Sequence, residues 1–194
     1  MVYPHMVWAA GNQTSSQSAN IFEIKITDSN LVNKISNPNQ TLTIGEIQAT
    51  DPLVVNLQAY LQKNKSPLQA YTTQLLQHEN WKTVLSISFV ESHMCIHNLN
   101  YNCSGIGGPG HFYAFDDFGG WIDCMSNLLN KRYYGQTFDQ MNGVYVQPKS
   151  VNWALGSKKI YNELVTLERI SDEQRVAMAQ NTIKQNQELA TIAQ

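Results

Sequence analysis

The sequence predicts a mostly α-helical protein: a helical domain around a central buried helix, with a short irregular or β segment and an arm at each end. Three observations predict it. Beyond residue 50, apolar residues recur at three- and four-residue spacing in one segment after another. Residues 84–90 form a run that is too apolar for a surface helix and too short to span a membrane. Residues 107–110, three glycines and a proline, forbid a helix between the helical segments.

The composition is that of one folded domain with extensions. The chain has 194 residues, enough for one substantial core, and 42% of them are hydrophobic, as in ordinary globular proteins. The net charge is -2 and the Lys and Arg residues are scattered, which argues against a nucleic-acid partner. No apolar run approaches the roughly 20 residues of a membrane-spanning helix, so no transmembrane segment is expected.

The first 50 residues predict an arm outside the main domain. Residues 14–20 are mostly Ser, Gln and Asn and indicate a flexible lead-in. Residues 21–27 then alternate apolar and polar side chains, and residues 41–47 weakly repeat the pattern. This alternation predicts short strands, either a small hairpin or an edge that pairs with another element.

Start signals mark three helices before the glycine segment. Asp51 suits a helix cap and Pro52 suits the first turn that follows it. The Ser66-Pro67 pair repeats this signal, and an apolar face continues to residue 76. Asn80 begins the third helix, which contains the apolar run and forms the centre of the core.

Further start signals follow the glycine segment. Asp116 or Asp117 opens a helix that ends at residues 133–135, and a short helical turn follows at residues 138–141. Ser150 begins the next helix, and Ser171-Asp172-Glu173 is a further capping signal that predicts a separate last helix. These signals divide the chain into an N-terminal arm (1–50), a helical domain (51–167) and a C-terminal helical tail (168–194).

Glu91 is the main candidate for chemistry. It ends the apolar run, where a carboxylate must be paired with a cation or neutralised, or its pKa must rise. A buried acid at a helix end, facing a glycine loop, is suited to general-acid catalysis beside a groove. The alternative is a structural carboxylate that pairs with a cation such as Arg132.

The cysteines leave two interpretations open. Cys95 and Cys103 flank a short Asn-rich loop, which favours one disulfide bond; the alternative is two free thiols in a reducing compartment. Cys124 lies among large apolar residues and is expected to act as a small buried hydrophobe. The N-terminus shows no complete signal peptide, although residues 6–11 are compatible with the end of one.

A metal site is not expected. His93 and His97 have the spacing of one helix face, with Cys95 between them. However, the helix should end near His93, and no third ligand is evident. We therefore expect no metal and no cofactor.

Four stretches of the sequence resemble one superfamily. Glu91-Ser92, followed by NCSGIGG at residues 102–108, resembles the E-S and N-x-[aromatic]-G-I-x-G signature of lysozyme-like peptidoglycan glycosidases. These include bacterial endo-β-N-acetylglucosaminidases of the flagellar and autolysin type and the lytic transglycosylases. Segments that resemble the same families in the same order are residues 51–71, 111–129 and 141–160.

The resemblance implies an α+β lysozyme-like fold and two catalytic roles. Glu91 matches the general acid, which protonates the glycosidic oxygen of a β-1,4-linked amino sugar. Tyr145 matches the tyrosine of the closing loop, whose hydroxyl would orient the acid or steady the developing oxocarbenium ion. The pKa of such an acid must rise toward the working pH, which apolar surroundings achieve.

The resemblance also implies substrate contacts around the glycine loop. Backbone groups of Asn102, Gly105 and Ile106 would hold an N-acetyl group or a sugar hydroxyl, and Tyr113 would stack on a sugar ring. Ser104 is also expected to bind substrate, but it stands where the glucosaminidases have an aromatic residue, so one stacking contact is missing.

A second acid is absent from the expected place. Two-carboxylate glycosidases hold their acids about 5–9.5 Å apart, but residues 108–113 contain no carboxylate. Asp116 and Asp117 are the nearest, and a helix cap explains them as well. We therefore expect a single-acid mechanism, either lytic transglycosylation or assistance by the N-acetyl group of the substrate.

The function implied by the resemblance is cleavage of peptidoglycan glycan strands, in the cell envelope or outside the cell. The alternative is an inactive lysozyme-like module that binds glycan or acts as a scaffold. The terminal arms are further candidates for self-association or for binding a protein partner.

Overall fold

The computed structural model describes residues 51–108 and 110–192, and these are mostly helical, as expected. Helices hold 67% of the described residues, and no strand is found among them. The only β contacts within the described part are isolated bridges, Leu99 with Asn102 and Asn142 with Val146. The strands expected at residues 21–27 lie outside the described residues.

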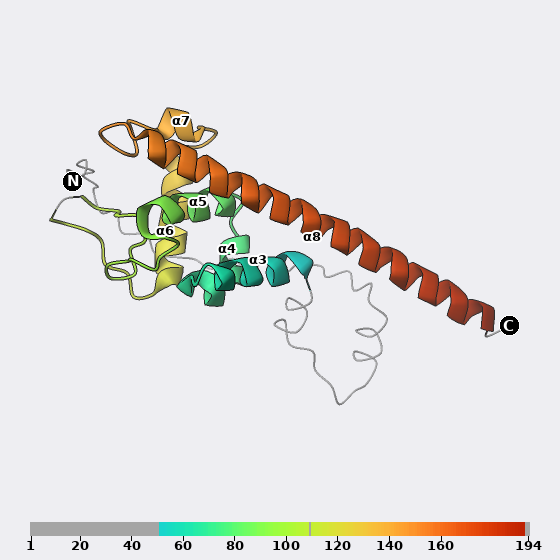
Figure 1. Ribbon diagram of the computed structural model, residues 1–194. Coiled ribbons are helices and arrows are strands. Elements are labelled where there is room, and N and C mark those ends of the chain that lie inside the picture. Colours follow the sequence, from blue (N-terminus) through green and yellow to red (C-terminus); the bar gives the residue numbers. More distant parts are fainter. Residues whose placement is uncertain (1–50, 109, 193–194) are drawn as a thin grey trace.

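Helix α5 (Trp81–Ser92) is the central buried helix that the sequence predicts. Val84, Leu85 and Ile87 are fully buried, and even Ser86 and Ser88 have no exposed surface. Helix α8 (Val151–Ile192) packs along α5 more extensively than any other element does, and α3 (Pro52–Lys63) also packs on α8 (Figure 1). The centre of the core therefore lies around α5, where α8 packs against it.

The first two start signals are confirmed. The Asp51 side chain accepts a hydrogen bond of 2.7 Å from the backbone N–H of Leu53 and so caps α3. Ser66 caps a 3-10 helix, η1 (Pro67–Tyr71), by accepting from the N–H of Leu68, and α4 (Thr72–Leu76) follows directly. Two short elements thus stand where the apolar face of residues 66–76 predicts one.

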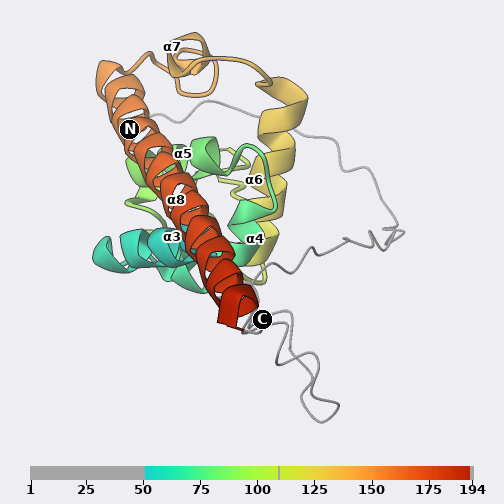
Figure 2. The same cartoon turned by 90° about the vertical axis from the view of Figure 1, so that its right-hand side faces the viewer.

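Helix α6 (Phe118–Arg132) follows the glycine loop. Its cap is Asp117, whose carboxylate accepts from the N–H of Gly120 at 2.8 Å. Helix α7 (Phe138–Met141) is a single turn, and Thr137 and Gln140 form a reciprocal capping box at its start. Figure 2 shows α7 above α5 and α6 to its right, with α3 below α5.

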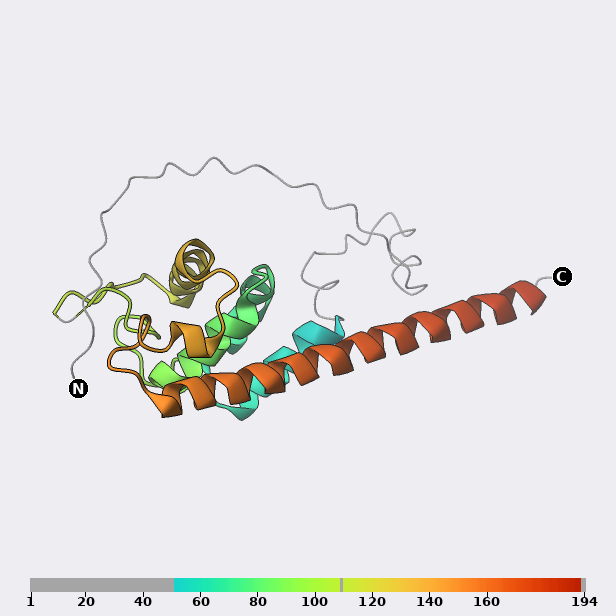
Figure 3. The same ribbon diagram turned by 90° about the horizontal axis from the view of Figure 1, so that it is seen from above.

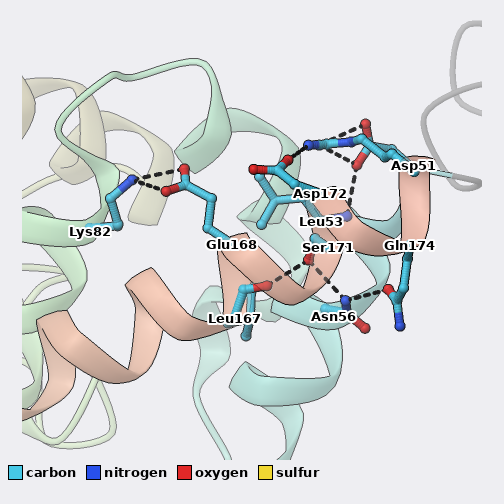
Figure 4. Close-up of polar contacts among 10 residues, drawn as sticks. Asp51, Leu53, Asn56, Lys82, Leu167, Glu168, Ser171, Asp172 and Gln174 are labelled. Carbon is cyan, nitrogen blue, oxygen red and sulfur yellow. Dashed lines mark hydrogen bonds and ion pairs between the residues drawn. The ribbon is translucent and has the colours of Figure 1, made fainter. Parts of the chain in front are cut away.

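The prediction of a separate last helix is wrong, because α8 runs without a break through Ser171-Asp172-Glu173. Ser171 is buried and donates to the carbonyl of Leu167, four residues back, while its hydroxyl accepts from Asn56 on α3 (Figure 4). A serine that bonds the preceding turn in this way is compatible with a helix interior. Ser171 therefore lies inside the helix and does not cap a new one.

Charged pairs anchor the middle of α8 to the body. Arg175 bonds Asp51 at 2.7 Å, and Lys82 of α5 bonds Glu168 at 2.7 Å. Beyond Arg175 the helix continues away from the other helices (Figures 1 and 3). No helix in the described residues combines the length and the apolar character needed to cross a bilayer.

Candidate active site

Glu91 lies in the last turn of α5, where the chain reverses sharply. The helix ends at His93, whose φ is 53°, and Met94 and Cys95 also adopt left-handed conformations, with φ of 54° and 69°. Left-handed backbone is costly for residues other than glycine, so surrounding contacts must hold it. The reversal turns the chain back at the buried end of the helix and leaves Glu91 beside the loop that follows.

Ser92 and a disulfide tie that loop to the helix. The Ser92 hydroxyl donates to the carbonyl of Cys103 at 2.7 Å and accepts from the N–H of Cys95 at 3.0 Å. Cys95 and Cys103 form the disulfide that their spacing favours. Because all of these groups are buried, the glycine loop is fixed against the end of α5.

Asn102 holds the glycine loop in shape from within. Its amide donates to the carbonyls of Ile106, at 2.8 Å, and Tyr113, at 3.1 Å, and its oxygen accepts from the N–H of Ile106 at 3.0 Å. The side chain is 5% exposed. Asn102 therefore shapes the loop, while Ile106 and its neighbours form the loop surface.

A groove of about 1010 Å³ opens between the end of α5, the glycine loop and the start of α8. Gly107 gives the loop its close turn: φ is 125°, and an added Cβ would lie 2.3 Å from the carbonyl oxygen of His111. Only glycine fits there. The groove is lined by Phe89, Val90, Glu91, His93, Ser104, Gly105, Ile106, Gly107, Gly108, Leu128, Tyr145, Val146, Gln147, Pro148, Lys149, Ser150, Asn152, Trp153 and Gly156.

Glu91 is partly buried in the groove wall and accepts one hydrogen bond. Its Oε1 atom lies 2.8 Å from Nε1 of Trp153, which donates the indole N–H. Burial raises the pKa of the Glu91 carboxyl, and the Trp153 N–H opposes this by stabilising the charged form; the net direction is upward. No cation contributes to this shift among the described residues. Glu91 therefore holds its proton at higher pH than a free glutamate does.

Tyr145 lies behind Trp153 in a buried aromatic stack. The two rings are 5.5 Å apart at 28°, and Tyr133 meets Tyr145 edge-on at 5.6 Å. The Tyr145 hydroxyl points toward the carbonyl of Ser104 at 3.5 Å, at the limit of a hydrogen bond. Burial, and next the charge of Glu91, raise the pKa of Tyr145 well above its ordinary value, so the phenol stays protonated. It can act as a neutral donor but not as a base.

Trp153, which no motif in the sequence marks as functional, is the side chain that contacts Glu91. Ser150 accepts from the backbone N–H of Trp153 at 3.2 Å and so sets the first turn of α8. The position of Trp153 in that turn brings its indole to the end of α5. A tryptophan just after a helix start, and eight residues after the expected catalytic Tyr145, is the only sequence signal that could have indicated it.

Ser104 faces inward from the loop. Its hydroxyl accepts from Nε1 of Trp121 at 2.9 Å, and the side chain is buried. Ser104, Gly105 and Ile106 all line the groove, whereas Asn102 and Tyr113 do not. Tyr113 lies outside, with 38% of its surface exposed. The structure thus brings together Glu91 and Tyr145 with three of the five residues expected to bind substrate.

Among the described residues, Glu91 is the only carboxylate in the groove lining, and Lys149 is the only lysine or arginine there. Asp116 and Asp117 are exposed and do not line the groove, and Asp117 is committed to the cap of α6. The arrangement can therefore deliver one proton and take it back. It offers no second acid among the described residues.

The rings of His93 and His97 stack edge-on, with centroids 5.3 Å apart. Within residues 51–108 and 110–192, no three His, Cys, Asp or Glu side chains are grouped so that they could hold a metal ion. Cys124 is a free thiol, half-buried against the core.

Comparison of the chain with protein-family models, with characterised proteins and with solved structures gave no significant match.

Proposed function

We propose that the protein cleaves the glycan strands of peptidoglycan, with Glu91 as the general acid of a lysozyme-like domain. The observation that carries the proposal is the position of Glu91: a carboxyl of raised pKa, in the wall of a groove, hydrogen-bonded by Trp153 and facing a rigid glycine loop. A general acid needs both a proton near neutral pH and access to the substrate oxygen. The raised pKa of Glu91 and its place in the groove lining support the proposal on both points.

A single carboxylate favours lytic transglycosylation over two-acid hydrolysis. Glu91 would donate its proton to the glycosidic oxygen as the bond from the anomeric carbon to that oxygen breaks, and the leaving sugar departs as an alcohol. The primary hydroxyl of the muramic acid residue would then attack the anomeric carbon and return its proton to Glu91. The acid is restored, no water is consumed, and an anhydro-muramic end is formed.

The loop and the aromatic stack supply the remaining parts. Backbone groups of Gly105 and Ile106, which lie in the groove lining, would hold sugar hydroxyls or the N-acetyl group. Tyr145 would support the site through Trp153, on which it stacks, and through its neutral hydroxyl. The Cys95–Cys103 disulfide suits an oxidising compartment, which favours action in the cell envelope or outside the cell.

The test is digestion of purified peptidoglycan sacculi. The parent protein should release muropeptides, and Glu91→Gln should lose at least about 100-fold in rate, because general acid catalysis contributes this much. Glu188→Gln, the same change on the exposed far part of α8, is the matched control and should digest like the parent. Mass spectrometry of the products separates anhydro-muramic ends from reducing ends. If the parent releases nothing, or Glu91→Gln releases as much, the proposal fails.

The second candidate is a lysozyme-like module that binds or organises glycan without cleaving it. The observation that favours it is the lone carboxylate of the groove. Sedimentation with sacculi distinguishes the two: retention of the parent protein with no released products supports the binding module.

Partners other than glycan are proposed for the ends of the chain. The far part of α8 exposes Val176 and Ile183, each 57% exposed and one heptad apart, on a helix that projects from the body. Light scattering of the full chain and of residues 51–175, which keep the Arg175–Asp51 pair, should give an oligomer for the first and a monomer for the second. Monomer masses for both would exclude self-association through the ends.

A further inference from the structure

The segment between α7 and α8 is a hydrogen-bonded loop at the edge of the groove. The N–H of Gly143 donates to the carbonyl of Val146 at 3.0 Å, and the N–H of Tyr145 donates to the carbonyl of Met141 at 2.8 Å. The N–H of Ser150 donates to the Asn142 side chain at 2.8 Å, which closes the loop just after Lys149. The backbone that carries Lys149 is therefore held on both sides.

The aliphatic stem of Lys149 lies directly against Gly143. A Cβ added to Gly143 would lie 2.7 Å from Cε and 2.8 Å from Cγ of Lys149, closer than carbon atoms can approach. The missing side chain of Gly143 is what makes room for the stem. The stem lies along this backbone while Lys149 as a whole stays exposed, and Lys149 lines the groove.

The Lys149 ammonium is left without a partner. Elsewhere, Lys82 pairs with Glu168 and Lys158 with Asp139. Among the described residues, no hydrogen bond or ion pair is formed by Nζ of Lys149. The groove thus holds one acid, Glu91, and one unpaired lysine. An unpaired cation with a packed stem in a binding groove is suited to an anionic group of the ligand.

We propose that Lys149 binds a carboxylate of the glycan, so that the groove prefers strands carrying acidic amino sugars over neutral ones. This inference rests on the proposed glycan-binding function and names the substrate class. Where no peptide is attached, muramic acid carries a free lactyl carboxylate on its sugar ring, whereas strands of N-acetylglucosamine alone carry no charge. Lys149 is accordingly a specificity-determining residue, separate from the acid that cleaves.

The test compares binding of one glycan in two forms: a soluble muramic-acid-containing oligosaccharide, and the same oligosaccharide with its carboxyl groups reduced to alcohols. Binding is measured by calorimetry with the full-length Glu91→Gln variant, which holds the ligand without turnover. We expect the acidic form to bind about three- to fivefold more tightly, the range of one solvent-accessible ion pair. This preference should disappear at about 0.5 M salt, because the charges are then screened.

Substitutions of Lys149 make the test specific. In the same Glu91→Gln background, Lys149→Gln should bind both forms equally, and Lys149→Arg should keep the preference. Lys159→Gln, on an exposed part of α8 outside the groove lining, is the matched control and should also keep it. Equal binding of the two forms before Lys149 is changed, no binding of either, or an unchanged preference in Lys149→Gln would each overturn the inference. Cleavage of sacculi by the parent reports separately on the proposed function.

Discussion

Trp153 donates its indole N–H to Glu91 at 2.8 Å, across 62 positions of sequence. The bond joins the last turn of α5 to the first turn of α8, and these two helices pack most extensively of the elements that the structure describes. Because Trp153 also stacks on Tyr145, the carboxyl is oriented by a ring that is itself held in place. The position of the candidate acid therefore depends on helix packing as well as on the local chain.

Replacing Trp153 should change the acidity of Glu91. The indole N–H stabilises the carboxylate, so Trp153→Phe should raise the pKa of Glu91 further above its ordinary value. Titration of the Glu91 carboxyl by carbon-13 NMR measures this directly. Trp121→Phe is the matched control, because that indole donates to Ser104 and not to Glu91. An unchanged pKa in Trp153→Phe, or an equal rise in Trp121→Phe, would contradict the role of the bond.

The ionised Glu91 side chain should lower the free energy of unfolding at neutral pH. Since burial raises its folded pKa above the unfolded value, its contribution to stability is fully present below the unfolded pKa and is lost as pH rises through the folded pKa. Glu91→Gln keeps an acceptor for Trp153 and cannot ionise. In urea unfolding, the variant should exceed the parent in free energy of unfolding at about pH 7, with the gap closing toward about pH 4. If the free energy of unfolding of the parent at the higher pH equals or exceeds that of Glu91→Gln, the result would argue against a buried acid.

The disulfide should contribute both stability and loop order. Cys95 and Cys103 are 8 positions apart, and closing so short a loop is worth roughly 2–3 kcal/mol in the chain-entropy model. A Cys95→Ser, Cys103→Ser double variant should lose this amount in urea unfolding. Adding reductant should then destabilise the parent but leave the double variant unchanged, and a parent unaffected by full reduction would disagree with this role.

Asn102 should matter for stability more than an exposed asparagine does. Asn102→Ala leaves buried groups of Ile106 and the carbonyl of Tyr113 without their partner, which we expect to cost about 2–4 kcal/mol. Amide hydrogen exchange at Ile106 should become faster, since that N–H loses its acceptor. Asn98→Ala, which removes an exposed side chain bonded to the carbonyl of Cys95, is the control and should cost under about 1 kcal/mol. Similar losses of free energy of unfolding in both variants would refute the role of Asn102 in holding the loop.

Local rules were sufficient for much of the fold. Caps at Asp51, Ser66 and Asp117 form as predicted, because a short polar side chain satisfies the free N–H groups of a helix start whatever surrounds it. The apolar run before Glu91 predicts the central helix for a similar reason, since so many apolar side chains in one segment can only be buried. The spacing of Cys95 and Cys103 favoured the disulfide that forms but left two free thiols as an alternative.

The sequence by itself determined which segments are helical, where most of them begin and that a carboxyl ends the buried one. Tertiary structure alone decided that Trp153 meets Glu91, that Asn102 turns inward, and that α8 continues past Ser171. Capping and periodicity involve neighbours a few positions apart, so they can be recognised in a single sequence. Contacts such as Glu91 with Trp153 or Ser171 with Asn56 join distant positions, and they exist only because packing selects which helix faces meet.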